Sequence, residues 1–383
     1  MDYYFSTGQM CVGYHKRPLI KDIEIGLEKG EILTLIGPNG AGKSTVLKSI
    51  ARQLELISGV VYLNKEDLTQ MSGTKLSQKM AVVLTDKMKT EMMTCEDVVA
   101  TGRYPYTGHF GLLSKKDYAI IKEAMELVHV TEIKDKDFCE ISDGQRQRVM
   151  LARAICQEPE IIILDEPTSY LDVKYKLEFL SILQEMQRKK GLTVIMSLHE
   201  LELAARVSDK ILCIRGEYVD RFGRPEEIFV PGYIADLFSI ASGSFDEENG
   251  SMELEAPKEE AKVFVIAGGG TGRNVYRSLQ REGIAFISGI LFENDVDYPV
   301  AKALATEVIH AEGFEPMTEE LVIRAKKVLD SCTRVICCRQ SFGTLDMANS
   351  ELLSYARQRG MKIDFVSGEK KKDRMESSRG RMK

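Results

Sequence analysis

Apolar runs alternate with segments of helical spacing through the first two thirds of the chain. The runs at 32–36, 161–164 and 192–196 are apolar at nearly every position, which is typical of strands buried on both faces. Alternating apolar positions at 3–14 and 23–27 indicate half-buried strands. Segments of helical spacing lie at residues 43–54, 145–156 and 174–190. Buried strands that alternate with helices predict an α/β fold with a parallel core sheet.

The hydrophobic pattern stops at an acidic stretch and then restarts. We assign residues 1–242 to a first domain and 243–261, which are small and acidic, to a solvated linker. Residues 262–368 are expected to form a smaller Rossmann-like α/β domain. Its expected strands lie at 263–267, 284–291, 334–338 and 362–366. Residues 369–383 carry seven basic and three acidic residues, and we expect this tail to be disordered.

The composition limits the possible functions. The 383 residues are 44% hydrophobic and 29% charged, as in soluble globular proteins. No apolar run reaches the ~18 residues that cross a bilayer, and no signal-peptide pattern is present, so we expect neither membrane spans nor secretion. The net charge of −6 argues against nucleic acid as a partner. The eight cysteines are scattered without metal-ligand spacing, which favours reduced thiols in the cytosol.

A complete phosphate-binding loop follows the run at 32–36. The spacing G-x-x-x-x-G-K-S places glycines where backbone N–H groups close around phosphates at the start of a helix. In this chemistry Lys43 reaches the β- and γ-phosphates, and the Ser44 hydroxyl ligates Mg²⁺. The predicted nucleotide-binding residues are Gly37, Pro38, Asn39, Gly40, Ala41, Gly42, Lys43, Ser44 and Thr45. We therefore expect the chain to bind a nucleoside triphosphate with Mg²⁺.

Two acids directly follow the apolar run at 161–164. Asp165 is placed to orient the Mg²⁺ shell. Glu166, one residue on, is placed to polarise an attacking water as a general base. Alone, this pattern often marks only a strand end, but beside a phosphate loop it predicts nucleotide hydrolysis.

The segment at 141–148, which precedes a helix, resembles the signature motif of ATP-binding cassette (ABC) proteins. The motif order also matches that family: phosphate loop, signature, Asp-Glu strand and histidine. The family signature closes on the γ-phosphate held by a second subunit, which implies a homodimer that binds ATP. The matching residues are Ser142, Asp143, Gly144 and Gln145. Asp143 stands where the family usually has glycine, and it places a negative charge near the phosphate.

Four further roles come from this resemblance. His199 matches the switch histidine that contacts the γ-phosphate, and Asp172 matches the D-loop that couples the two ATP sites. Tyr14 falls where the family stacks an aromatic ring on adenine. Thr85 stands where a glutamine usually reaches Mg²⁺, and we take it as the corresponding metal contact. The resemblance covers residues 2–242 and implies an ABC-type P-loop domain with a helical subdomain.

The segment at 96–106 resembles one subgroup of ABC ATPases in particular. Its Gly-Arg-x-Pro-Tyr sequence is similar to the ATPases of importers for iron-siderophores, haem and cobalamin. The resemblance implies a homodimeric ATPase on the cytoplasmic face of the membrane, held there by separate permease subunits. It also implies an extracytoplasmic solute-binding protein.

Other functions remain open at this point. A soluble ABC ATPase of the ribosome would carry two cassettes, and one of chromosomes would carry a long coiled coil after the phosphate loop. The chain has one cassette and no sustained heptads between Ser44 and Ser142. An exporter ATPase is a further alternative, which only the segment at 102–106 disfavours.

The second domain offers a weaker signal. Its glycine loop at 268–272 lacks the third glycine of a dinucleotide fingerprint, because Arg273 stands there. Glu293 and Asp295 lie where a ribose contact would come. A nucleotide or other anion is one interpretation of this loop, and a tight turn without a ligand is the other. We expect a regulatory domain.

Overall fold

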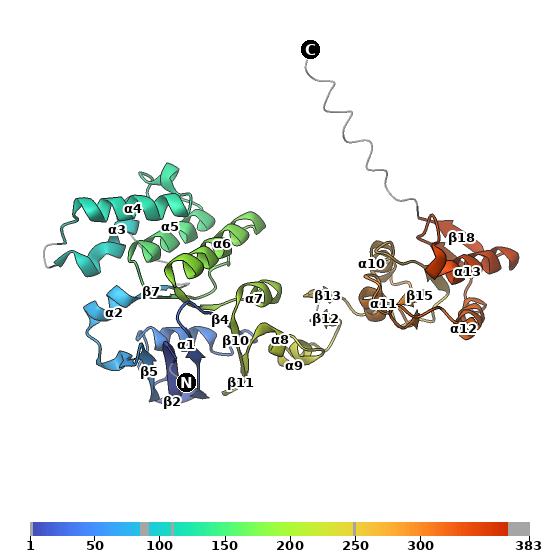
Figure 1. Cartoon of the computed structure of the whole chain (residues 1–383), viewed down its shortest axis with the longest axis horizontal. Coiled ribbons are helices and arrows are strands. Elements are labelled where there is room, and N and C mark those ends of the chain that lie inside the picture. Colours follow the sequence, from blue (N-terminus) through green and yellow to red (C-terminus); the bar gives the residue numbers. More distant parts are fainter. Residues whose placement is uncertain (1–2, 85–91, 109–110, 248–249, 367–383) are drawn as a thin grey trace, which may run out of the picture. The chain divides into compact units, whose positions relative to one another are not determined.

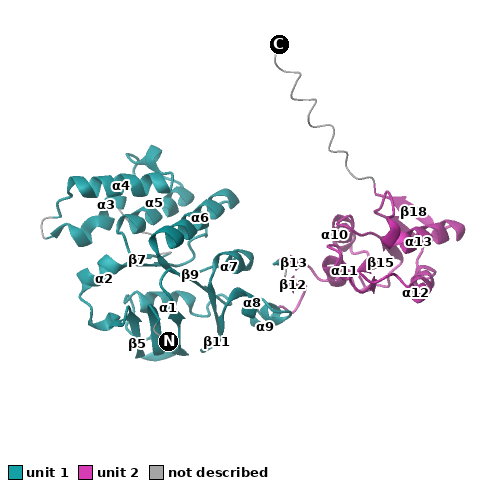
Figure 2. Cartoon of the chain, in the orientation of Figure 1, with its two compact units in different colours: residues 1–239, 247–250 teal, residues 240–246, 251–383 magenta. Residues whose placement is uncertain are grey.

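The chain forms two compact units. The computed structural model describes residues 3–84, 92–108, 111–247 and 250–366 (Figure 1). The first unit comprises residues 1–239 with 247–250, and the second comprises 240–246 with 251–383 (Figure 2). The predicted tail at 369–383 lies outside the described residues. No described helix combines the length and the apolar character needed to cross a membrane.

Five parallel strands form the centre of the first unit. In spatial order they are β10 (Lys210–Arg215), β4 (Ile32–Ile36), β9 (Thr193–Ser197), β8 (Ile161–Leu164) and β7 (Met80–Val83). Every residue of β4, β8 and β9 is buried. The register pairs Ile195 with Leu33 on one side and with Ile163 on the other. The α/β fold predicted from the apolar runs is confirmed.

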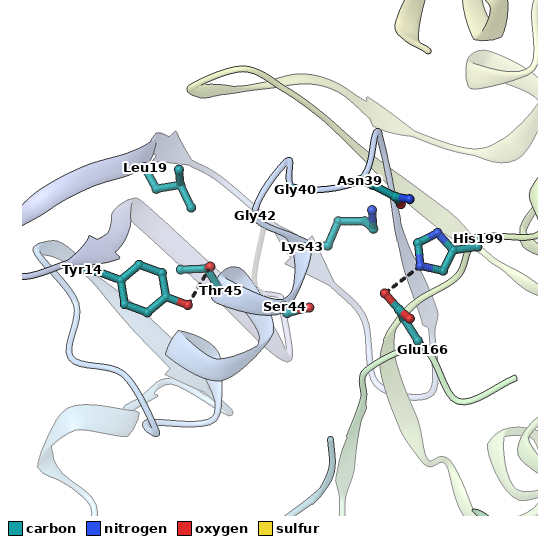
Figure 3. Close-up of a pocket in the computed structure, with 10 residues that line it drawn as sticks. All are labelled: Tyr14, Leu19, Asn39, Gly40, Gly42, Lys43, Ser44, Thr45, Glu166 and His199. Carbon is teal, nitrogen blue, oxygen red and sulfur yellow. Dashed lines mark hydrogen bonds and ion pairs between the residues drawn. The ribbon is translucent and has the colours of Figure 1, made fainter. Parts of the chain in front are cut away.

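Further strands extend this sheet beyond its parallel part. They are β1 (Phe5–Tyr14), β2 (Arg17–Ile23), β3 (Gly26–Leu27), β5 (Ser58–Leu63), β6 (Glu66–Asp67) and β11 (Tyr218–Gly223). Among the described residues the sheet has eleven strands, in the order β6-β5-β1-β2-β11-β10-β4-β9-β8-β7, with β3 paired to β1. Strand β1 pairs antiparallel with β2 and ends at Tyr14. The ring of Tyr14 thereby lies at the rim of the phosphate loop (Figure 3).

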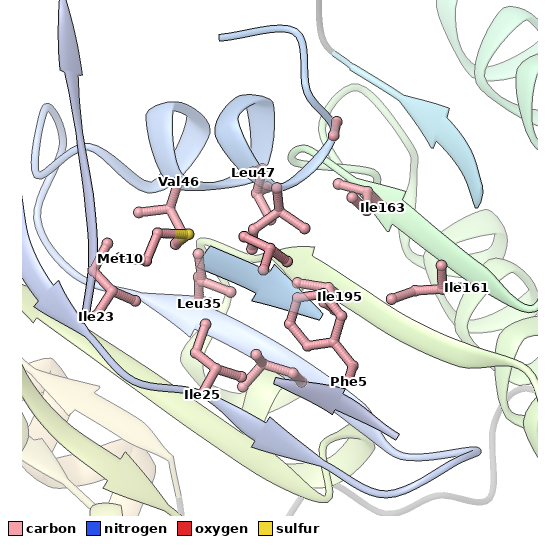
Figure 4. Close-up of a cluster of buried hydrophobic side chains, with 14 of the residues drawn as sticks. Phe5, Met10, Ile23, Ile25, Leu35, Val46, Leu47, Ile161, Ile163 and Ile195 are labelled. Carbon is pink, nitrogen blue, oxygen red and sulfur yellow. The ribbon is translucent and has the colours of Figure 1, made fainter. Parts of the chain in front are cut away.

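Helix α1 (Lys43–Ile50), which starts in the phosphate loop, packs on this sheet. Its Val46 and Leu47 are fully buried in one cluster with Leu35, Ile163 and Ile195 (Figure 4). Fully burying one such aliphatic side chain stabilises the fold by about 1.5–3 kcal/mol. The core therefore fixes the start of α1 relative to the ends of the neighbouring strands.

The remaining helices of the first unit surround the sheet. They are η1 (Leu68–Gln70), α2 (Gly73–Lys79), α6 (Val173–Lys190), α7 (Leu201–Val207), α8 (Pro225–Ile228) and α9 (Tyr233–Leu237). A separate helical group comprises α3 (Cys95–Ala100), η2 (Thr101–Tyr106), α4 (Lys115–Leu127), η4 (Thr131–Ile133) and α5 (Asp143–Cys156). This group forms the upper part of the unit in Figure 1.

A buried arginine holds the helical group together. Arg103 is only 3% exposed, and its guanidinium pairs with Asp117 and Glu158, both at 2.9 Å. It also donates to the carbonyl oxygen of Cys156 at 2.8 Å. Gly102 permits this close approach, since a Cβ there would lie 2.3 Å from the carbonyl oxygen of Arg153. The Gly-Arg pair of the segment at 96–106 thus joins η2 to α4 and to the end of α5.

The second unit has a parallel sheet covered on both faces. The strand order is β16 (Glu307–Ala311), β15 (Phe286–Phe292), β14 (Val263–Ile266), β17 (Arg334–Cys337) and β18 (Lys362–Phe365). The connecting helices are α10 (Arg273–Arg281), α11 (Tyr298–Leu304), α12 (Glu319–Leu329), η5 (Thr344–Asp346) and α13 (Met347–Gln358). Phe264 packs with α12 and α13 on one face, and Val265 packs with α10 and α11 on the other. This is a Rossmann-like order.

Two strand regions differ from the prediction. The stretch assigned to a linker contains a hairpin of β12 (Ser244–Asp246) and β13 (Ser251–Glu253). Phe245 is 8% exposed there, and the Glu253 carboxylate pairs with the guanidinium of Arg277 on α10. Strand β16 was not predicted, because a five-residue edge strand that contains a glutamate and a histidine carries little apolar signal.

Removing the acid that faces Arg103 should change the acid stability of the protein. Both the hydroxyl and the backbone N–H of Ser114 donate to Asp117, and with Arg103 they lower the Asp117 pKa to about 2. A lowered pKa adds stability above the unfolded pKa of about 4 and loses it as pH falls towards 2. In acid titrations, Asp117→Asn should lose less free energy of unfolding over this range than wild type.

At pH 7 the same variant should be less stable by about 1–3 kcal/mol. The matched control is Asp97→Asn, which alters the capping acid of α3 and leaves Arg103 paired. An identical acid dependence in wild type and Asp117→Asn would contradict this assignment.

Candidate nucleotide-binding site

The phosphate loop depends on glycines with left-handed backbone angles. Gly37, Gly40 and Gly42 have φ values of 148°, 79° and 97°. A Cβ on Gly37 would lie 2.4 Å from the carbonyl oxygen of Ile214. Only glycine therefore fits at this position directly after β4. Gly42 is the N-cap of α1, whose first-turn N–H groups present the positive end of the helix to the loop.

The side chain of Lys43 folds back into the phosphate loop. Its side chain is 5% exposed, and its ammonium donates to the carbonyl oxygens of Gly37 at 2.8 Å and Pro38 at 3.1 Å. Burial lowers the Lys43 pKa, and the nearby charges of Glu166 and Asp165 partly oppose that shift. A buried ammonium beside a helix N-terminus forms a strong site for a phosphate.

The loop opens into a pocket of about 520 Å³, a volume typical of small-ligand sites. It is lined by Tyr14, Leu19, Asn39, Gly40, Gly42, Lys43, Ser44, Thr45, Glu166 and His199 (Figure 3). Predicted residues from four distant segments therefore meet in one cavity. Tyr14 is 48% exposed, and its hydroxyl lies 3.2 Å from that of Thr45.

A carboxylate and an imidazole face each other across from the loop. Glu166 Oε1 lies 2.6 Å from His199 Nε2, and the hydroxyl of Ser169 donates to Glu166 Oε2 at 3.4 Å. Figure 3 shows this pair beside the side chains of Lys43 and Asn39. The two contacts thus hold the Glu166 carboxylate in the pocket wall beside the phosphate loop.

Two oxygen donors suited to Mg²⁺ come from the segments that follow β4 and β8. The Ser44 hydroxyl lines the pocket, and Asp165, which is 2% exposed, follows β8 at the same edge of the sheet. A hydroxyl and a carboxylate are the hard ligands that Mg²⁺ prefers. Thr85, the third predicted metal contact, lies outside the described residues.

Comparison with known proteins decides the family. A model of the ABC transporter family matches residues 20–169, and a model of the MJ0874 family matches 286–382. The uncharacterized ABC transporter ATP-binding protein MJ0873 of Methanocaldococcus jannaschii is 42% identical over 286 residues, which are 74% of this chain and 99% of that protein. The chain belongs to the ABC transporter ATP-binding proteins.

Other relatives of this ABC protein carry names of importer subunits. The iron(3+)-hydroxamate import ATP-binding protein FhuC of Bacillus subtilis is 37% identical over 235 residues, 61% of this chain and 87% of FhuC. The cobalamin import ATP-binding protein BtuD of Halobacterium salinarum is 30% identical over 317 residues, 81% of this chain and 79% of BtuD. The predicted family resemblance is confirmed.

Solved structures agree on the fold. The dimeric structure of MJ0796, a bacterial ABC transporter cassette, superposes with a TM-score of 0.52 at 22% identity. The match covers 57% of this chain and 98% of the cassette. The first unit therefore has the fold of an ABC transporter cassette.

The signature and D-loop residues lie apart from this pocket within one chain. Ser142 is the N-cap of α5 and forms a capping box with Gln145. Asp143 lies in the first turn and pairs with Arg146 at 2.6 Å. Asp172 caps α6 by accepting the backbone N–H of Tyr175 at 3.0 Å. The described lining of the pocket includes none of these residues.

The glycine loop of the second unit is occupied by side chains of the same chain. Asp295 accepts the backbone N–H of Gly269 at 3.0 and 2.8 Å. The fully buried Asp297 accepts from Gly272 at 2.9 Å and from Arg273 at 3.2 Å. Two carboxylates thus take the N–H groups that a pyrophosphate would need at the start of α10. Of the two interpretations left open, the geometry favours the turn without a nucleotide.

Sequence reasoning missed two residues of the site. Leu19 lines the pocket from β2, but one apolar residue in a half-buried strand gives no distinguishing signal. Ser197 touches both acids of the site from the end of β9. A polar residue that ends an apolar strand two positions before His199 was a usable signal.

These two glycine loops lead to a prediction about nucleotide stoichiometry. The full chain should bind one nucleotide, because the first loop surrounds an ammonium, whereas carboxylates of the chain already accept N–H groups of the second loop. Lys43→Ala should weaken binding by at least tenfold, since charge-assisted contacts to phosphate contribute about 1.5–3 kcal/mol each. Isothermal titration with a non-hydrolysable ATP analogue measures both quantities.

The matched control alters a cation near the second loop. The Arg339 guanidinium lies close to Gly268 and Gly269, so Arg339→Ala would weaken a nucleotide bound there. We expect unchanged affinity and stoichiometry for this variant. Two nucleotides per wild-type chain, or one tight nucleotide in Lys43→Ala, would refute the assignment.

Proposed function

We propose that this protein is the ATP-hydrolysing subunit of an ABC importer for an iron-siderophore, haem or cobalamin-type chelate. The observation that carries the proposal is the 2.6 Å pair of Glu166 and His199 beside the phosphate loop, because it provides a base where hydrolysis needs one. The relatives named for iron(3+)-hydroxamate and cobalamin import support the direction and the class of cargo.

Several residues in and beside the pocket have a task in this reaction. Tyr14 offers its exposed ring to adenine, and the loop N–H groups with Lys43 hold the phosphates. Ser44 and Asp165 would hold Mg²⁺, which offsets phosphate charge during hydrolysis. Glu166 accepts the proton of the attacking water while His199 keeps its carboxylate oriented.

The working unit in this proposal is a homodimer. Ser142 and the backbone of Gly144, at the N-terminus of α5 in one subunit, would close on the γ-phosphate held by the other. The negative charge of Asp143 is offset by Arg146 at 2.6 Å, so the missing glycine of the signature leaves an electrostatically balanced helix start. Asp172 would meet the second subunit near the same interface.

The membrane partners would dock on the helical group. Arg103 is buried in that group, whereas Tyr104 and Tyr106 beside it are 59% and 40% exposed. Amphipathic tyrosines are common at protein interfaces. The proposal places the protein on the cytoplasmic face of the membrane, bound to permease subunits that receive cargo from an extracytoplasmic solute-binding protein.

Replacing the proposed base should separate binding from hydrolysis. Glu166→Gln should bind MgATP with near wild-type affinity and hydrolyse it at least 100-fold more slowly, because general-base catalysis contributes about 10²–10⁴-fold. Size-exclusion chromatography with ATP should show Glu166→Gln accumulating as a dimer. Hydrolysis at the wild-type rate would remove Glu166 from the mechanism.

The importer assignment has its own test. Affinity purification of the tagged chain from detergent-solubilised membranes of its source cell, followed by mass spectrometry, should recover a many-spanning permease and a solute-binding protein. A tagged Lys43→Ala variant serves as the control for capture that depends on ATP binding. Recovery of ribosomal or chromosomal proteins without a permease would favour a soluble ABC ATPase instead.

A further inference from the structure

One buried hydroxyl links the two acids of the proposed ATPase site. Ser197 is the last residue of β9 and is fully buried. Its hydroxyl donates to Asp165 Oδ1 at 2.7 Å and accepts the backbone N–H of Glu166 at 2.9 Å. The donor and one acceptor site of the hydroxyl are therefore committed to two consecutive residues.

The backbone that Ser197 contacts is strained. Glu166 has a φ of 49°, a left-handed conformation that costs a side chain other than glycine roughly 1–2 kcal/mol. Such a conformation persists only where the surroundings hold it in place. The bond from the Glu166 N–H to Ser197 is one such restraint, since it fixes the peptide that precedes the strained residue.

The end of β9 contacts Glu166 at two points. Ser197 holds its backbone, and His199, two residues later, pairs with its carboxylate at 2.6 Å. Ser197 itself does not line the described nucleotide pocket. Its effect on the reaction would therefore pass through Glu166 and Asp165 rather than through contact with the nucleotide.

From this geometry we infer that Ser197 is a positioning residue for ATP hydrolysis, which sets the backbone of Glu166 and the carboxylate of Asp165 in one hydrogen-bonded unit. The inference rests on the proposed function. A displaced base is costly, because misplacing a reacting group by about 1 Å can slow a reaction by about 10²-fold.

The test compares Ser197→Ala with a hydroxyl deletion on the same strand. Thr193 begins β9, is fully buried, and accepts the backbone N–H of Gly30 at 3.0 Å. Thr193→Val removes a similar buried hydrogen bond at the opposite end of the strand. We expect Ser197→Ala to lower kcat by about 10- to 100-fold with KM for ATP within about twofold, and Thr193→Val to keep the wild-type kcat.

A double-mutant cycle separates positioning from general loss of stability. If Ser197 acts through Glu166, the Ser197→Ala change should have little further effect on the residual rate of Glu166→Gln. Ser197→Thr, which restores the hydroxyl, should recover part of kcat. Ser197→Cys keeps the size of the side chain with a weaker donor, and it replaces Ser197→Ala in the comparison if the alanine variant does not fold.

The possible outcomes distinguish a failure of the Ser197 role from a failure of the proposed ATPase function. A wild-type kcat in Ser197→Ala and Ser197→Cys, with Glu166→Gln inactive, overturns the role of Ser197 and leaves the ATPase assignment intact. Equal losses of kcat in Ser197→Ala and Thr193→Val overturn it as well, because they indicate a purely structural effect. Glu166→Gln hydrolysing at the wild-type rate would instead contradict the proposed function.

Discussion

The parallel register of β4, β9 and β8 is the constraint on which the rest of the site depends. Because the strands are parallel and Leu33, Ile195 and Ile163 lie side by side, all three strands end at the same edge of the sheet. The phosphate loop follows β4, the two acids follow β8, and His199 follows β9. The register of the sheet thus brings together residues that are more than 150 positions apart in the sequence, such as Lys43 and His199.

The two glycine loops show how similar local sequences acquire opposite properties. In the first unit the loop surrounds a buried ammonium, and several of its residues line an open pocket. In the second unit Asp295 and Asp297 already satisfy the corresponding N–H groups. A helix N-terminus attracts anions in both cases, but in the second unit the anion is a carboxylate of the same chain. The difference comes from Asp295 and Asp297, which lie in the segment after β15, and not from the glycines themselves.

The sequence predicted those parts of the structure that rest on local patterns. The strands at 32–36 and 161–164 were found residue for residue, because a short, continuous apolar run bounded by turn residues is typical of a buried parallel strand. The hairpin at Phe245 was missed because its two three-residue strands lie in a small, acidic stretch, and the edge strand β16 was missed because it has few large apolar residues. Ser197 does end an apolar strand as a polar residue, but its two hydrogen bonds to the residues after β8 follow only from the structure.

The helical group separates the residues that stabilise it from those that are available for a partner. In the sequence the segment at 96–106 forms one family signature, yet Arg103 points into the group and bonds to Asp117, Glu158 and Cys156. A buried guanidinium with three partners is costly to disturb, because removing one partner leaves a buried charge unpaired. Tyr104 is 59% exposed, whereas Tyr106, although 40% exposed, still donates to the carbonyl oxygen of Gln157 at 3.0 Å. A buried, bonded arginine beneath an exposed tyrosine therefore lets the group keep its internal packing independently of what contacts its surface.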